Sequence, residues 1–86
     1  MSGMDVGVEV SLYPFEGCYA PLIHTFIGQL EACADLKVLP GSLSTQVYGE
    51  YGRVFAALGE AMRTTLAARQ ADGSRAAFVL KVLGPL

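Results

Sequence analysis

The sequence predicts an α+β domain in which a four-stranded antiparallel sheet carries two helices on one face. The strand-like and helix-like segments follow each other in the order β-α-β-β-α-β over 86 residues, which is enough chain for one small domain spanning residues 1–86. The first segment alternates strictly, as expected for a strand with one face on a core. Right-handed crossovers then place the first and third strands at the centre, flanked by the fourth and second, which is the ferredoxin-like arrangement.

The N-terminal half supplies the first strand and the first helix. Residues 6–13 form the strand, and Pro14 ends it. Its core-facing residues are Val6, Val8, Val10 and Leu12. Pro21 suits the first turn of a helix, where its missing N–H is no loss, and the helix is expected to end near Ala34. Its apolar stripe has helical spacing and consists of Ile23, Phe26, Ile27, Leu30 and Cys33.

The C-terminal half supplies the remaining three strands and the longer helix. A short apolar piece at residues 36–39 and a strand at residues 43–50 form a hairpin around the turn signal Pro40-Gly41. Residues 52–69 are rich in alanine and predict the second helix. The apolar run at residues 76–83 predicts the last strand.

Composition and charge exclude several classes of protein. Apolar residues make up 52% of the chain and the net charge is −2, which excludes a disordered chain. No basic stripe is present to follow a phosphate backbone, so nucleic acid is not expected as a partner. No stretch is long and apolar enough to cross a membrane, and no signal peptide is visible, so a cytoplasmic protein is expected. The high apolar content also predicts self-association.

Neither a metal site nor a catalytic centre is expected. Cys18 and Cys33 lie 15 residues apart without a C-x-x-C motif, and His24 is the one histidine, so no zinc site, other metal or cofactor is predicted. We expect Cys18 in a loop and Cys33 in the core. His24 has no nucleophile at a recognisable spacing and lies on an exposed helix face. The chain is therefore not expected to be an enzyme.

Polar side chains are predicted to gather at one end of the central strand pair. Because the first and third strands are antiparallel neighbours, the end of the first lies beside the start of the third. The residues brought together are Ser11, Tyr13, Ser44, Thr45 and Gln46. Hydroxyl and amide groups suit a neutral heteroaromatic ligand, while Tyr13 and Tyr48 add flat faces for stacking. Glu50, or Glu9, would balance a cation.

The same pattern also fits a sheet face that simply meets water, with Glu9 and Lys81 as a cross-strand ion pair. Strict alternation places Ser11, Tyr13, Ser44 and Gln46 away from the helices and points Thr45 toward them. A pocket on the open face would therefore need a second subunit or a loop to enclose it. Two sheets packed face to face or edge to edge would supply that cover.

Three segments resemble the YkoF-like family, whose members bind thiamine and hydroxymethylpyrimidine. They are Ser11-Leu12-Tyr13-Pro14, the stretch at residues 44–51 and the final strand at residues 78–82. The resemblance runs from Val6 to Leu83. Two departures are the aromatic Phe15, where the family often has an aliphatic residue, and the short C-terminal end.

The resemblance implies a cytoplasmic, non-enzymatic protein that binds thiamine or its hydroxymethylpyrimidine precursor and forms a homodimer or homotetramer. The ligand-binding residues that it implies are Ser11, Tyr13, Ser44, Thr45, Gln46, Tyr48 and Glu50. The alternative is an ACT-like regulatory or structural oligomerisation module that binds a different small molecule or a protein partner.

Overall fold

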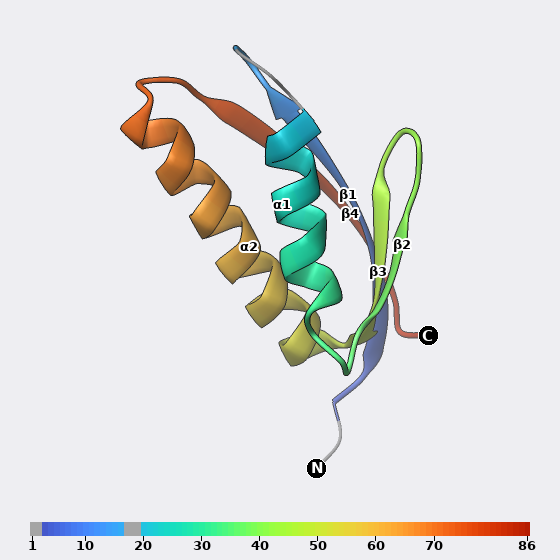
Figure 1. Cartoon of the computed structure of the whole chain (residues 1–86). Helices are drawn as coiled ribbons and strands as arrows, with labels where there is room; N and C mark the ends of the chain where they lie inside the picture. Colours follow the sequence, from blue (N-terminus) through green and yellow to red (C-terminus); the bar gives the residue numbers. More distant parts are fainter. Residues whose placement is uncertain (1–2, 17–19) are drawn as a thin grey trace.

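Two helices cover one face of a four-stranded antiparallel sheet, as the sequence predicts (Figure 1). The computed structural model describes residues 3–16 and 20–86. The elements are β1 (Asp5–Pro14), α1 (Ala20–Glu31), β2 (Lys37–Pro40), β3 (Thr45–Glu50), α2 (Tyr51–Ala71) and β4 (Ala76–Leu83). The strand order is β2-β3-β1-β4 with antiparallel neighbours throughout, so the predicted ferredoxin-like fold is confirmed.

The core lies between the sheet and the two helices. Alternation in β1 sends Val6, Val8 and Val10 into this layer, where each is at most 2% exposed. The residues that meet them from β3, α1 and α2 are Val47, Phe26, Leu30, Val54, Leu58 and Ala61. Burial of these side chains is the main stabilising contribution to the domain.

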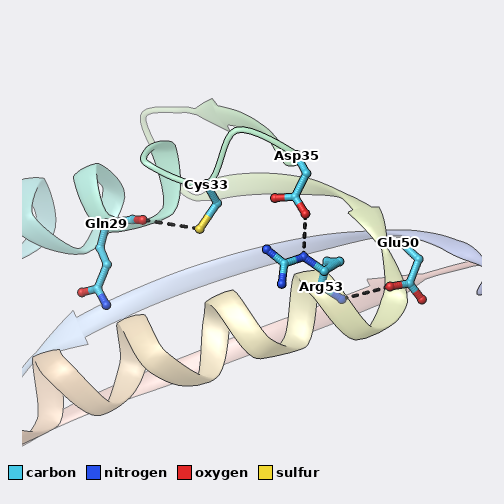
Figure 2. A network of polar contacts seen from close by, with 5 residues as sticks. All are labelled: Gln29, Cys33, Asp35, Glu50 and Arg53. Atoms are coloured by element: carbon cyan, nitrogen blue, oxygen red, sulfur yellow. Dashed lines mark hydrogen bonds and ion pairs between the residues drawn. The ribbon is translucent and has the colours of Figure 1, made fainter.

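The first helix ends at Glu31, three residues earlier than the spacing predicts. Beyond it the Cys33 N–H donates to the Leu30 carbonyl at 3.0 Å, and the Leu36 N–H donates to the Cys33 carbonyl at 3.1 Å. These tight turns reverse the chain before β2. Cys33, expected in the core, is half-buried instead, and its thiol lies 3.8 Å from the Gln29 carbonyl oxygen (Figure 2). Cys18 lies outside the described residues.

The hairpin between β2 and β3 has a longer loop than the sequence predicts, because β3 begins at Thr45 and not at Leu43. The Gly41 N–H donates to the Ser44 carbonyl at 2.9 Å and closes the loop. A Cβ atom at position 41 would lie 2.8 Å from that same carbonyl oxygen, so this turn requires glycine. Leu43 is left at the tip with 93% of its surface exposed.

An ion pair ties the segment after α1 to the start of α2. The Arg53 Nε donates to the Asp35 carboxylate at 2.5 Å (Figure 2). This hydrogen bond is the main reason that the pKa of Asp35 is lowered from its ordinary value of 3.8. Both side chains are well exposed, so the pair contributes little to stability at high salt.

Replacing Asp35 by asparagine is expected to remove a small pH-dependent part of the stability. Because the folded-state pKa of Asp35 lies below its unfolded value, its contribution is complete above pH 3.8 and is lost as the pH falls through the folded pKa. Urea unfolding of wild type and Asp35→Asn, from neutral pH to well below pH 3.8, should show their difference in stability shrinking with acidification. In an Arg53→Met background the same substitution should change the free energy of unfolding by the same amount at every pH. A pH-independent difference in the wild-type background would contradict the role of the pair.

Candidate functional site

The open face of the sheet carries a row of linked polar side chains that runs from the residue before β3, across β1, to β4. Ser44 Oγ donates to Glu9 Oε2 at 2.9 Å, and Lys81 Nζ lies 3.6 Å from Glu9 Oε1. Glu9 is opposite Lys81 in the β1–β4 register, so the predicted cross-strand pair is confirmed. Glu9 therefore links the start of β3 with the outer strand of the sheet.

A second polar contact on the open face depends on Gly7. A Cβ atom at position 7 would lie 2.6 Å from Tyr48 Cε1, so the tyrosine ring occupies the space above this glycine. The Tyr48 hydroxyl donates to Gln46 Oε1 at 2.6 Å. Together with Glu9, Lys81 and Leu83, these residues surround a shallow hollow of about 200 Å³.

A smaller, more enclosed cavity of about 90 Å³ lies where β1, the start of β3 and α1 meet. Its apolar lining comes from both layers of the fold and consists of Val10, Leu12, Ile23, Phe26, Ile27 and Leu43. Its polar lining comes from the strand ends and the hairpin loop and includes Ser11, Ser42, Ser44 and Thr45. Apolar walls with a few hydroxyls are typical of sites for small organic ligands.

Thr45 is the polar residue most deeply placed in this cavity. It points toward the helices, as the alternation of β3 predicts, and is 6% exposed. Among the described residues, no fully buried side-chain nitrogen or oxygen lacks a hydrogen-bond partner. A hydroxyl that lines the cavity can donate a hydrogen bond to a ligand there and accept one from it.

The structure divides the seven residues that the sequence analysis singled out. Ser11, Ser44 and Thr45 line the cavity beneath α1. Gln46 and Tyr48 border the hollow on the open face. Tyr13 is opposite Ala77 of β4, lies beyond the start of β3 and is 53% exposed. The seventh residue, Glu50, lies at the far end of β3.

Glu50 acts as the N-cap of α2. Its Oε1 accepts a hydrogen bond from the Arg53 backbone N–H at 3.1 Å, where the positive end of the helix dipole favours a carboxylate (Figure 2). Six residues of extended chain separate Glu50 from Ser44, which amounts to roughly 20 Å. The structure therefore does not bring Glu50 to the cavity.

The cavity has walls that the sequence analysis did not identify as site residues. Ile23, Phe26 and Ile27 have helical spacing, which predicts a core face and gives no sign that part of that face borders a void. Phe26 is 2% exposed, and its ring centroid is 5.1 Å from that of Phe78, so its position is fixed by packing.

Within the described residues, no cluster of three or more histidine, cysteine, aspartate or glutamate side chains is placed to hold a metal ion. In the same part of the chain, none of the helices combines the length and the apolar character needed to span a membrane.

Comparison with solved structures shows several proteins with this fold. A hypothetical protein of Methanocaldococcus jannascii, MJ1052, superimposes with a TM-score of 0.80 at 25% identity, over 94% of this chain and 80% of that one. TM0486 of Thermotoga maritima, described as a "putative thiamine biosynthesis/salvage protein", gives 0.77 at 19% identity, over 91% and 81% of the two chains. A DUF77 domain of unknown function from Bacillus cereus gives 0.73 at 15% identity, over 95% and 78%.

No protein-family model matches the sequence, and no curated protein matches it either. The structural similarities establish a shared fold, and one of the proteins that share it is connected by its description with thiamine.

Proposed function

We propose that the protein binds thiamine or its hydroxymethylpyrimidine precursor, as a YkoF-like protein, in the cavity beneath α1. The observation that carries the proposal is the position of Thr45, which is 6% exposed and lines a largely apolar cavity together with Ser11 and Ser44. These three residues belong to two of the three segments that resemble the family. The thiamine-related description of one structural neighbour supports the same ligand class.

The size of the cavity favours one ring of the ligand. Its volume of about 90 Å³ is well below the roughly 300–1,000 Å³ of pockets that enclose whole drug-sized molecules. We therefore assign the cavity to the aminopyrimidine ring, with Phe26 and Ile27 as apolar walls and the Thr45 hydroxyl as a hydrogen-bonding group. Leu43, exposed at the tip of the hairpin loop, would cover the entrance.

The rest of thiamine would extend toward the open face of the sheet. Ser44 lines the cavity and also donates to Glu9, so the Glu9 carboxylate is one hydrogen bond away from the bound ring. A carboxylate at this position would balance the positive charge of a thiazolium group. We propose binding without turnover, because the hydroxyls and apolar side chains of the cavity hold a ring but are poor proton-transfer groups at neutral pH.

Titration calorimetry with thiamine, hydroxymethylpyrimidine and thiamine diphosphate tests the proposal. We expect saturable binding of one of the first two at micromolar concentration or below. Thr45→Val keeps the shape of the side chain and removes its hydroxyl, so it should weaken binding about fivefold to tenfold, the equivalent of one hydrogen bond.

The matched control is Thr64→Val on α2, where the threonine hydroxyl is exposed and donates to the Glu60 carbonyl of its own helix. This variant should bind as wild type does. An absence of heat from folded wild-type protein with all three compounds would contradict the proposal, and so would unchanged affinity in Thr45→Val.

A regulatory or structural oligomerisation module of the ACT-like kind is the second candidate. The exposure of Val79, Val82 and Leu83 on β4 favours it, because these apolar side chains suit association with another chain. Persistent self-association together with no vitamin binding would support this candidate over the first.

A further inference from the structure

The tip of the β2–β3 hairpin, residues 41–44, forms the mouth of the cavity beneath α1. All four of its residues line the cavity, together with residues of β1 and α1. Leu43 supplies the one large apolar side chain of the tip and is 93% exposed. Nearly all of its surface is therefore still available for burial against a ligand, and burial of apolar surface is favourable.

Two hydrogen bonds hold the base of the hairpin tip in place. The Gly41 N–H donates to the Ser44 carbonyl at 2.9 Å and joins the two ends of the tip. Ser44 Oγ donates to Glu9 Oε2 at 2.9 Å and fastens the tip to the central strand β1. Glu9 in turn lies 3.6 Å from Lys81 Nζ of β4. The place of Leu43 at the mouth thus depends on Glu9, which does not itself line the cavity.

We propose that Glu9 is a positioning residue: through Ser44 it holds Leu43 at the mouth of the cavity, where the leucine closes over a bound ligand as a lid. This inference rests on the proposed function and goes beyond it by assigning the control of ligand release. Because the base of the tip is already fixed, closure moves the Leu43 side chain and not the strands. A side chain on a fixed backbone loses less conformational freedom on closing than a mobile loop does.

The positioning role differs from the charge balance that Glu9 would offer to a thiazolium group. Charge balance requires a cationic ligand, whereas the place of the lid matters for any ring in the cavity. Hydroxymethylpyrimidine lacks the thiazolium group, so its binding reports on the lid. Glu9→Gln removes the charge and keeps a carbonyl oxygen that can accept the Ser44 hydrogen bond, whereas Glu9→Leu removes both. The two variants therefore separate position from charge.

Titration calorimetry with hydroxymethylpyrimidine and with thiamine tests the assignment. Leu43→Ser should weaken the binding of either compound about fivefold to tenfold, because the lid loses its apolar surface. Glu9→Leu should weaken the binding of hydroxymethylpyrimidine by about the same factor, while Glu9→Gln should stay within about twofold of wild type. Unchanged affinity in Leu43→Ser or in Glu9→Leu would overturn the proposal, and so would equal losses in the two Glu9 variants.

A double-mutant cycle shows whether Glu9 acts through Leu43. In a Leu43→Ser background, Glu9→Leu should cause at most about a twofold further loss of affinity, because no apolar lid is left to position. Losses that multiply would mean that the two residues act independently, which would overturn the positioning role. The cycle gives the same coupling with thiamine, because the charge contribution of Glu9 is present in both backgrounds and cancels.

Leu39→Ser is the matched control for Leu43→Ser. Leu39 lies on β2, in the other arm of the same hairpin, is 43% exposed and does not line the cavity. This variant should bind both compounds as wild type does. A loss of affinity equal to that of Leu43→Ser would show a general effect of the hairpin and would contradict the lid.

Tryptophan fluorescence detects the closure itself. The sequence has no tryptophan, so Leu43→Trp places a single reporter at the mouth. Its emission should shift to shorter wavelength when hydroxymethylpyrimidine or thiamine binds and the indole leaves water, while Leu39→Trp should show no shift. Binding by calorimetry without a shift in Leu43→Trp would overturn the lid and leave the proposed function intact. An absence of binding by folded wild type would instead overturn the proposed function, and the lid with it.

Discussion

Replacement of Arg69 by methionine should lower the free energy of unfolding by roughly 2–4 kcal/mol, a large loss for a domain of this size. Arg69 lies in the last part of α2 and is 6% exposed. Its Nη2 donates to the Glu16 carbonyl at 2.6 Å and to the Arg75 carbonyl at 3.2 Å, and its Nε donates to the same Arg75 carbonyl at 3.3 Å. The side chain therefore joins the chain after β1 to the turn between α2 and β4. Methionine has a similar length and none of these donors.

Urea unfolding followed by circular dichroism measures the effect. Arg63→Met is the matched control, because the Arg63 side chain is 80% exposed on the same helix and only approaches Glu60 at 3.7 Å. It should change stability by less than about 0.5 kcal/mol. Arg69→Lys should fall between the two, since an ammonium group cannot reproduce the fork that reaches both carbonyls. Equal stability of Arg69→Met and Arg63→Met would refute the bridging role.

Truncation of Leu58 to alanine should cost about 2–5 kcal/mol. Leu58 is fully buried in α2 and belongs to the cluster that contains the β1 valines and Leu30 of α1. Its removal leaves a void between the sheet and both helices, and the neighbouring side chains can fill that void only in part. A domain of 86 residues has a thin core, so this loss takes much of its total stability.

The control for Leu58 is Leu66→Ala, two turns later in the same helix and 44% exposed. It makes the same chemical change with little burial to lose, so its effect should remain below about 1 kcal/mol. Thermal and urea unfolding of both variants give the comparison. Similar losses in the two variants would mean that α2 is stabilised by its helix propensity and not by the core contact of Leu58.

The alternation of apolar and polar residues along the strands made much of the fold predictable from the sequence. The valines of β1 alternate because one face of the strand meets the helices, and this signal located both the strand and its buried face. It also placed Thr45 toward the helices and Glu9 opposite Lys81, which the structure confirms. Element ends were less predictable. Local hydrogen bonds decide them, as at Cys33 and Gly41, and no periodic pattern records those bonds.

The candidate site was predictable only in part. Backbone pairing placed Ser44 and Thr45 near the end of β1, but a void beneath α1 depends on how side chains fill space, which a sequence pattern does not contain. The sequence pattern does not single out Arg69, because a charged residue on a helix is expected to face solvent. Glu50 is included among the ligand residues because a carboxylate could balance a cation and because it lies in a segment that resembles the family, whereas in the structure its carboxylate caps α2.

The separation of the two faces of β1 has a consequence for how this protein can change over evolutionary time. The valines that meet the helices are constrained by volume, while Glu9 and Ser11 between them are not part of that packing. Substitutions on the open face can therefore accumulate and alter what the sheet touches without repacking the interior. Ser44 and Thr45 are the exception. The side chains of these adjacent residues point to opposite faces of the sheet, and both residues line the same cavity. At these two positions a change of ligand and a change of core packing would therefore have to occur together.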